Sequence, residues 1–343
     1  PPPPPPPFFF IDTAPPETYT LSLHDALPIY TNPDNALYQY VAYHILPGSY
    51  DLKKMRSFDT ADVTSKIWDT SSTGNIVKVS NKNDIFYLNY ADEEHRATFL
   101  EDYSALQAKN GYIHQVSTWL PIAEAEPETV LFDLCNYSLI GEWIAAGHGE
   151  EGIKFQAVGD EEKKCSVTEL NCYQYELVNP AGAYDSYYNV TYFQISSKND
   201  WKTANNGDLL MLNIGNTGWV SMQTPSIIKG KYKVTLQFGY ATSQLFIKQQ
   251  SNSNGGQMDF KLISGTEEVL LNEQTEYKPY TELEGSAPKL GLYKSVINNE
   301  IEFTDTQSYT LKIVLKDPGA SASSNSKYRI YLDYILFEPV IEE

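Results

Sequence analysis

Residues 231–238 read Lys-Tyr-Lys-Val-Thr-Leu-Gln-Phe, in which apolar side chains alternate with polar ones. Successive side chains of a strand point to opposite faces of a sheet, so this segment is predicted to bury one face and expose the other. The same alternation recurs at residues 309–316, and residues 328–337 form a longer apolar run that ends before Glu338-Pro339. These three segments favour an antiparallel sheet with one covered face.

Further short segments of the same character surround these three, and Gly, Pro and Asn residues separate them. They are residues 129–135, 189–196, 209–214, 218–223, 243–249 and 257–263. We therefore predict an antiparallel β-sandwich over residues 129–343, preceded by an acidic, proline-broken linker at residues 123–128. The fold class expected for the whole chain is mainly β, with a small α+β part ahead of the linker.

The composition narrows the class of protein. The chain has 343 residues, enough for about two or three domains that each bury a core. It carries 44 acidic and 25 basic residues, a net charge of -19, so nucleic acid and anionic membrane surfaces are poor partners. The 26 tyrosines outnumber the 14 phenylalanines and suit half-wet sheets. An exported β protein is favoured, and a cytosolic β-rich protein remains the alternative.

The first 29 residues differ in character from the rest. Pro1 to Pro7 and Phe8 to Phe10 are what homopolymer DNA would encode, and residues 17–29 look like translated sequencing adapter from a metagenomic contig. We expect residues 1–29 to be a disordered assembly artefact, with a polyproline II arm as the alternative. A signal peptide or lipoprotein cysteine would then lie upstream of this sequence.

Two motifs stand out in residues 30–122. Residues 43–48 read Tyr-His-Ile-Leu-Pro-Gly, and residues 110–121 read Asn-Gly-Tyr-Ile-His-Gln-Val-Ser-Thr-Trp-Leu-Pro. Together they resemble the second half of a fasciclin (FAS1) domain, which pairs a Tyr-His motif with a Pro-Gly turn and closes on an Asn-Gly-aliphatic-His strand. The resemblance implies that the opening half of such a domain is absent here, which would leave apolar surface uncovered.

The fasciclin resemblance also implies a function. It indicates a non-catalytic adhesion or scaffold protein on the extracellular face of a cell, with Tyr43 and His44 as the adhesion motif that contacts another protein. Taken as residues, His44 and His114 are better explained as structural histidines, because a metal site needs further donors that the sequence does not place nearby. The metal content stays undetermined.

Local patterns predict the elements of this first part. Residues 34–45 are expected to form a helix capped by Asp34, because apolar residues recur there at helical spacing. Residues 75–80 and 84–89 are expected to form a hairpin, and residues 112–120 a closing strand.

Within the predicted sandwich, residues 218–225, 229–234 and 331–335 resemble jelly-roll, galactose-binding-like modules. A fasciclin domain followed by such a module looks like surface lipoproteins of glycan-using gut bacteria, which implies attachment to the outer membrane through a lipid anchor. The alternative function is therefore glycan binding by the sandwich, for which Trp201, Trp219, Tyr187 and Tyr188 are the candidate stacking rings. Of the two tryptophans, we expect Trp201 to be the more exposed and Trp219 to be buried.

Cysteines and catalytic motifs add little. Cys165 and Cys172 could form a disulfide if their segment is a hairpin, three reduced thiols are the alternative, and Cys135 is expected to be buried. The chain has no Gly-x-Ser-x-Gly, phosphate-binding loop or His-Glu-x-x-His motif, so we expect no catalytic residues and no cofactor. A hydrolase is the least favoured reading, because it would need two carboxylates that face each other in an aromatic cleft.

Overall fold

A computed structural model gives the fold of the chain. It describes residues 32–57, 65–90, 96–120, 122–123, 125–145, 156–157, 163–168, 170–178, 190–195, 201–215, 217–240, 256–275, 277–279, 291–316 and 330–341. The expected artefact at residues 1–29 and the predicted strand at residues 243–249 lie outside these ranges. None of the helices in the described ranges has the length and apolar character needed to cross a bilayer.

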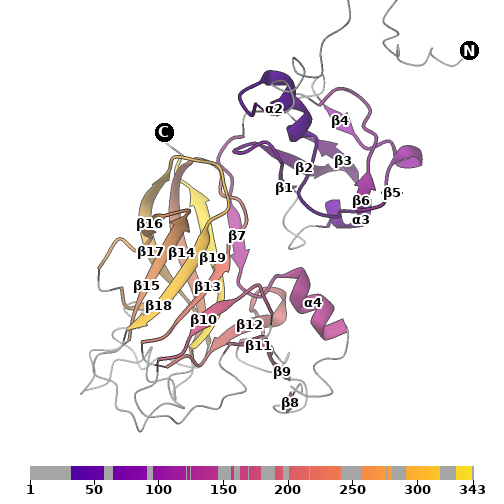
Figure 1. The fold of residues 1–343 in the computed structure, drawn as a ribbon. Helices are drawn as coiled ribbons and strands as arrows, with labels where there is room; N and C mark the ends of the chain where they lie inside the picture. The colour runs from indigo at the N-terminus through magenta and orange to yellow at the C-terminus, as the bar shows by residue number, and fades with distance from the viewer. Residues whose placement is uncertain are drawn as a thin grey trace, which may run out of the picture. The chain divides into compact units, whose positions relative to one another are not determined.

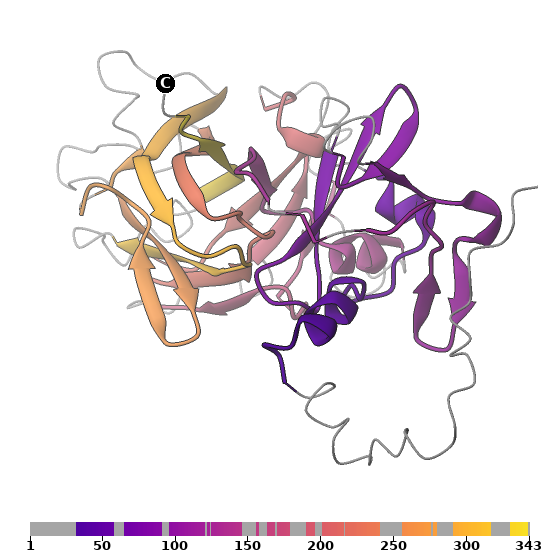
Figure 2. The ribbon, with the colours of Figure 1, turned by 90° about the horizontal axis from the view of Figure 1, so that it is seen from above.

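The chain divides into two compact units. The first comprises Pro1–Ser57 and Trp68–Ala123, and the second comprises Phe58–Ile67 and Glu124–Glu343. Strands outnumber helices in both units, and the second contains the longer strands (Figures 1 and 2). The mainly β character predicted from the alternating segments is thus confirmed.

The first unit combines short helices with small antiparallel sheets. Its elements are α2 (Ala36–Tyr43), α3 (Leu52–Met55), the end of β1 (Ser65–Asp69), β2 (Ile76–Lys82), β3 (Ile85–Leu88), β4 (Ala97–Thr98), η1 (Glu101–Tyr103), β5 (Leu106–Ala108) and β6 (Gly111–Ile113). One sheet has the order β1-β2-β3-β4, and β5 pairs with β6 in the other. The predicted hairpin is confirmed as β2–β3, whose turn holds Asn83 and Asp84 at positive φ.

Two local predictions in this unit are wrong. The helix is capped by Asn35 and not by Asp34, because the Asn35 side chain accepts hydrogen bonds from the backbone N–H groups of Leu37 and Tyr38. The closing strand expected at residues 112–120 ends at Ile113, since the chain beyond it makes only an isolated bridge. The core of the unit consists of Tyr43, Met55, Trp68, Val77, Val79, Leu88, Ala97, Phe99 and Leu120.

The second unit is built of two antiparallel sheets. Its elements are β7 (Val130–Asp133), α4 (Ser138–Ala145), β8 (Gln156–Ala157), β9 (Lys163–Ser166), β10 (Gln174–Glu176), β11 (Val190–Gln194), η2 (Asn205–Gly207), β12 (Asp208–Leu212), β13 (Trp219–Gln223), β14 (Gly230–Tyr240), β15 (Gln257–Ser264), β16 (Glu267–Leu270), β17 (Gly291–Phe303), β18 (Thr310–Lys316) and β19 (Ile330–Pro339). One sheet has the order β10-β13-β18-β15-β16. The other has the order β17-β14-β19-β12-β11-β9-β8, with β7 also paired to β19.

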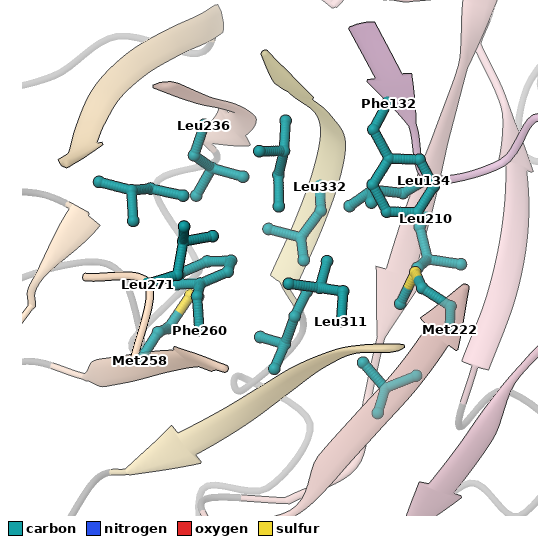
Figure 3. Packing of buried hydrophobic residues seen from close by; sticks show 14 of the residues in the cluster. Phe132, Leu134, Leu210, Met222, Leu236, Met258, Phe260, Leu271, Leu311 and Leu332 are labelled. Atoms are coloured by element: carbon teal, nitrogen blue, oxygen red, sulfur yellow. The ribbon is translucent and has the colours of Figure 1, made fainter. Parts of the chain in front are cut away.

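Apolar side chains from the two sheets meet in one core, shown in Figure 3. The larger sheet contributes Phe132, Leu210, Leu236 and Leu332, and the smaller sheet contributes Met222, Met258, Phe260 and Leu311. The alternation of residues 231–238 predicts this arrangement, because Tyr232, Val234, Leu236 and Phe238 are all completely buried. The β-sandwich expected from the sequence agrees with these two packed sheets.

A second apolar cluster lies on the other face of the larger sheet. It consists of Phe193, Ile195, Trp201, Ala204, Leu209, Met211 and Tyr331. On β12, Leu209 and Met211 belong to this cluster, whereas Leu210 and Leu212 belong to the central core. The strand is therefore buried on both faces, which explains why it reads as a continuous apolar run and not as an alternating one.

Strand β19 changes its partner along one edge. Residues 330–332 pair with β12, and residues 334–337 pair with β7 on the same edge. On the opposite edge, the register of β19 with β14 shifts between Gln237 and Phe238. Asp333 of β19 is the extra residue of this bulge, because its neighbours Leu332 and Tyr334 pair with Phe238 and Gln237. Such a bulge re-aims the side chain of the extra residue. Asp333 therefore sits where β7 ends and β12 begins.

Candidate functional site

The tryptophan at the start of β13 lies on the outer face of the smaller sheet. Its neighbours Val220 and Met222 point into the core, so Trp219 and Ser221 point away from it. The Trp219 ring is half-buried, and its Nε1 donates a hydrogen bond to Glu176 Oε2 at 2.5 Å. Glu176 is the residue paired with Trp219 across β10 and β13. Sequence reasoning expected Trp219 to be buried, and this expectation is wrong, because the indole lies on the outer face of the sheet.

A lysine from the next strand covers part of this indole. Lys312 Nζ lies 4.1 Å from the centroid of the Trp219 ring. Lys312 is paired with Ser221 across β13 and β18, so it lies diagonally opposite Trp219. The carboxylate and the ammonium thus contact the ring from two sides.

Gly218 makes this arrangement possible. A Cβ atom at this position would lie 2.0 Å from the carbonyl oxygen of Ile214 and 2.6 Å from that of Glu176. Both are backbone atoms, which cannot move aside without shifting their segments. Only glycine therefore lets the chain around Glu176 approach Trp219 this closely.

Other polar side chains extend the same face. Gln223 donates from Nε2 to Thr310 Oγ1 at 2.6 Å, and the Ser308 hydroxyl donates to Gln223 Oε1 at 3.3 Å. Further along the sheet, Lys261 pairs with Glu268 at 2.6 Å. We define the Trp219 patch as Glu176, Trp219, Gln223, Thr310 and Lys312. It offers one aromatic ring and hydrogen-bonding groups of both kinds.

The other predicted stacking residues do not join this patch. Trp201 is only 6% exposed, because it packs against Phe193 and Tyr331 and donates from Nε1 to the Tyr240 carbonyl at 3.2 Å. The expectation that Trp201 is the more exposed tryptophan is therefore wrong. Tyr187 and Tyr188 lie outside the described residues.

The predicted adhesion motif divides into a buried and an exposed residue. Tyr43 is completely buried, and its hydroxyl donates to the Ile76 carbonyl at 3.1 Å while it accepts from Asn89 Nδ2. His44 is exposed, and its Nδ1 lies 2.7 Å from the Tyr40 carbonyl oxygen. Tyr43 therefore holds the fold of the first unit and is not placed to touch a partner.

Apolar residues near this motif face solvent. Leu37 and Val41, one turn apart on α2, are each 52% exposed, and Trp119 is 76% exposed. The Tyr40 ring lies 6.1 Å from the Trp119 ring, which connects the helix to this tryptophan. We call Leu37, Tyr40, Val41 and Trp119 the α2 surface.

His114, the second histidine of the fasciclin-like motifs, is fully hydrogen-bonded. Its Nδ1 accepts from the backbone N–H of Ala105 at 3.1 Å, and its Nε2 lies 2.8 Å from the Tyr50 carbonyl. An accepting Nδ1 requires the proton on Nε2, so Nε2 donates to Tyr50. The arrangement agrees with a structural histidine.

Three carboxyl groups meet beneath the strand junction of the larger sheet. Asp133 ends β7, Asp208 begins β12 and Asp333 occupies the bulge of β19, and they are 3%, 8% and 1% exposed. One oxygen each of Asp133 and Asp208 and the Sγ of Cys135 all lie within 4.8 Å of one another. Sequence reasoning missed this cluster, because its members are separated by about 75 and about 125 residues and only strand pairing brings them together.

Amide groups link the members of the cluster. Asn205 Nδ2 and Asn206 Nδ2 donate to Asp133 Oδ2 at 2.7 and 2.8 Å. The Asn205 backbone N–H and Gln237 Nε2 donate to Asp333. The short helix η2 and strand β14 thus fix two of the three carboxyl groups.

The third carboxyl group is less well satisfied. Asp208 Oδ1 is buried and has no hydrogen-bond partner among the described residues. Burial and, to a smaller extent, the nearby Asp133 raise the pKa of Asp208 to about 8, against the lowering effect of a hydrogen bond from Tyr192. Burial also raises the pKa of Asp333 to about 7, against the lowering effect of the Gln237 and Asn205 hydrogen bonds.

Two of the three cysteines are thiols. Cys135 is buried and Cys172 half-buried, and both are free, so the candidate Cys165–Cys172 disulfide is not formed. The reason is local: β9, which carries Cys165, pairs with β11 and β8, and the segment after it makes two turns in place of a returning strand. The side chain of Cys165 lies outside the described residues.

Comparison with protein families gives one match. The model of a domain of unknown function (DUF5108) matches residues 132–340, which run from β7 to just beyond β19. The matched region is the second unit, and it leaves the segment that resembles a fasciclin domain outside. Among curated proteins, no match was found.

Several solved structures match the chain at low similarity. The insecticidal crystal protein Cry2Aa is 13% identical with a TM-score of 0.24, covering 39% of this chain and 17% of its own. A GH26-CBM35 β-(1,4)-mannanase from Podospora anserina is 10% identical with a TM-score of 0.21, covering 54% of this chain and 29% of its own. An exo-β-1,3-galactanase from Phanerochaete chrysosporium is 11% identical with a TM-score of 0.24, covering 82% and 67%.

Proposed function

We propose a function from the geometry of the second unit, because the chain belongs to the DUF5108 family, whose function is unknown. The proposed function is that of a non-catalytic glycan-binding module that binds through the Trp219 patch. One observation carries the proposal. Trp219 presents a half-exposed indole on a sheet face, with Glu176 bound to its Nε1 and Lys312 over its ring. An aromatic ring beside fixed polar groups is the arrangement that binds the apolar face and the hydroxyls of a sugar.

Two further features support the choice of a pyranose. Glu176 and Lys312 offer an acceptor and a donor next to the ring. Thr310, two residues from Lys312 on β18, and its cross-strand partner Gln223 continue the polar row. The ring is also positioned in advance, because its Nε1 hydrogen bond to Glu176 restricts its rotation. A site that is ordered before binding loses less entropy when the ligand arrives.

A hydrolytic function is not favoured. The carboxyl pair that approaches closely, Asp133 and Asp208, is buried beneath the sheet and is not in an aromatic cleft. Substrate would have to reach oxygens whose residues are only 3% and 8% exposed. The Trp219 patch contains one carboxylate, Glu176, and no second carboxylate that could share a catalytic role with it. Binding without catalysis is therefore our proposal.

We also propose where the protein acts. The strongly acidic, tyrosine-rich composition suits the extracellular face of a cell, and a lipid anchor to the outer membrane is part of this proposal. The jelly-roll, galactose-binding-like subtype of the sandwich belongs to it as well, on the sequence resemblance of residues 218–225 and 331–335.

A glycan array probed with the full chain tests the binding proposal. We expect saturable binding to a subset of glycans, weakened about 10- to 100-fold by Trp219→Ala, because one stacking ring contributes on the order of 1–3 kcal/mol. Trp119→Ala is the matched control, since it removes an exposed tryptophan from the other unit. Binding that survives Trp219→Ala unchanged, or no binding to any glycan, contradicts the proposal.

The second candidate function is adhesion of the fasciclin type by the first unit. The observation that favours it is the α2 surface, where Leu37, Val41 and Trp119 are exposed together. Exposed apolar groups of this size are typical of protein-binding surfaces, and the partner would be an extracellular protein. In this proposal His44, beside the surface, is the exposed member of the Tyr43-His44 motif.

The variants Trp219→Ala and Trp119→Ala, together with Val41→Ser, separate the two candidate functions. Adhesion of cells or of immobilised matrix proteins to the full chain should fall with Trp119→Ala or Val41→Ser and be unaffected by Trp219→Ala. The opposite pattern, with loss only in Trp219→Ala, would assign the adhesion to glycans on the partner. If neither variant changes adhesion, the α2 surface is not the contact.

A further inference from the structure

We propose that Asp133, Cys135 and Asp208 form a binding site for a divalent transition-metal cation of the zinc class. The three donor atoms, one oxygen from each carboxylate and the Cys135 Sγ, all lie within 4.8 Å of one another. A cation at their centre would lie within reach of all three after a small contraction. This proposed metal site shares no residue with the Trp219 patch or with the α2 surface.

The strands place the three donors. Asp133 ends β7, and two residues later Cys135 turns back toward it, because the Cys135 backbone N–H donates to Asp133 Oδ1 at 2.8 Å. Asp208 arrives from the start of β12 along the same edge of β19. The site therefore lies at the junction where β19 exchanges one partner for the other.

The buried Oδ1 of Asp208, which lacks a hydrogen-bond partner within the described ranges, is the second indication that this cluster binds a ligand. Asp208 is 8% exposed, yet its Oδ1 has no hydrogen-bond partner among the described residues. Buried polar atoms in folded proteins are nearly always paired, and a buried carboxylate oxygen without a partner is costly. Asp133 and Asp333 accept hydrogen bonds from amide groups, and Asp208 accepts one from Tyr192, but none of these bonds reaches Asp208 Oδ1. A cation would supply the interaction that Asp208 lacks.

The donor set selects the class of cation. Calcium and magnesium take oxygen ligands only, usually six or more, whereas zinc binds thiolate, imidazole and carboxylate in a tetrahedron. Two oxygens and one sulfur are too few for calcium and suit a borderline-soft ion with one position left open. On binding, the Cys135 thiol releases its proton to solvent, and the thiolate forms the sulfur–metal bond.

Titration of the full, metal-depleted chain with Co²⁺ and Zn²⁺ tests the proposal. Co²⁺ bound to a thiolate gives an intense near-ultraviolet charge-transfer absorption, which we expect in the wild-type protein and which added Zn²⁺ should displace. We expect Zn²⁺ to raise the unfolding temperature and Ca²⁺ to leave it unchanged. An equal effect of Ca²⁺, or cobalt binding without the thiolate absorption, overturns the proposal.

Three variants complete the test. Cys135→Ser should abolish the cobalt absorption, and Cys135→Ser and Asp208→Asn should each weaken zinc binding about 100-fold or more. Cys172→Ser is the matched control, because Cys172 is the other free thiol of the described residues and lies outside the donor set. If Cys172→Ser removes the absorption while Cys135→Ser keeps it, the proposed site is wrong. Should the Asp208 variant not fold, the wild-type cobalt spectrum still decides.

Discussion

The second unit holds two tryptophans in opposite settings. Trp201 follows a polar segment of the sequence, yet its ring closes an apolar cluster against Phe193 and Tyr331. Trp219 begins a strand whose next residues, Val220 and Met222, enter the core, yet its ring lies on the outer face with a carboxylate and an ammonium for neighbours. The identity of the flanking residues thus says little about the burial of a large ring. The side of the sheet on which the ring falls decides it.

The largest expected effect concerns Gly218, on which the setting of Trp219 depends. Gly218→Val places a Cβ against two backbone carbonyl oxygens, so the segment carrying Glu176 must separate from β13. We expect a loss of more than about 4 kcal/mol in the unfolding free energy of the second unit, measured by denaturant titration with circular dichroism. Gly141→Ala is the control, since a Cβ there meets nothing within 4 Å, and it should be neutral or slightly stabilising. A Gly218 variant of native stability would refute the close approach.

The next effect tests the two tryptophans directly. Trp201→Ala removes a buried ring and its hydrogen bond to the Tyr240 carbonyl, and we expect a loss of about 3–5 kcal/mol in unfolding free energy. Trp219→Ala removes a half-exposed ring and should cost less than about 1 kcal/mol. Denaturant titration of both variants measures the difference. Equal losses would mean that the two rings are not in the opposite settings described.

A smaller effect is expected at Gly239, which lies under the Trp201 ring. A Cβ at this position would lie 3.1 Å from Trp201 Cε2 and 3.3 Å from Leu209 Cδ1. Gly239→Ala should therefore overpack the outer cluster and cost about 1–2 kcal/mol, since the ring is held by neighbours on other sides. A shift of the Trp201 indole signal in the NMR spectrum should accompany the loss. If stability instead rises, the ring has room that the contacts do not show.

The smallest effect is expected at Lys312. Lys312→Met keeps most of the side-chain volume and removes the charge over the Trp219 ring, and we expect a loss of less than about 1 kcal/mol in unfolding free energy. Tryptophan fluorescence should change on the same substitution, because the ammonium no longer faces the indole. Lys261→Met is the control on the same sheet, since Lys261 pairs with Glu268 and not with a ring.

Much of the sandwich could be predicted from the sequence because alternation reports burial on one face. Residues 231–238 and 309–316 coincide with β14 and β18, whose apolar residues enter the core. Strand β17 could not be found this way. It lies at the end of its sheet, and polar residues such as Asn298 interrupt its pattern because they bond to the backbone of a neighbouring loop. The helix α4 is too short to give a clear periodic signal.

The candidate sites could likewise be predicted from the sequence only in part. Trp219 could be named from the sequence as a possible stacking ring, but its setting depends on Glu176 and Lys312, which come from other strands. The carboxyl cluster could not be found at all, because Asp133, Asp208 and Asp333 meet only through the pairing of β7 and β12 with β19. A buried acid at a strand end is a weak signal in one sequence and a clear one once the register is known.

The pairing of β7 with β19 has a consequence for how this unit assembles. The two strands are separated by nearly the whole matched region, so their contacts are of very high sequence separation. The ordering entropy of the intervening chain must be lost before this pairing forms, which makes slow folding and late closure of the sheet the expected kinetics. During synthesis the unit cannot close until its last strand has emerged. The same adjacency of first and last strands would let a circular permutant, cut elsewhere in a loop, keep the complete sheet.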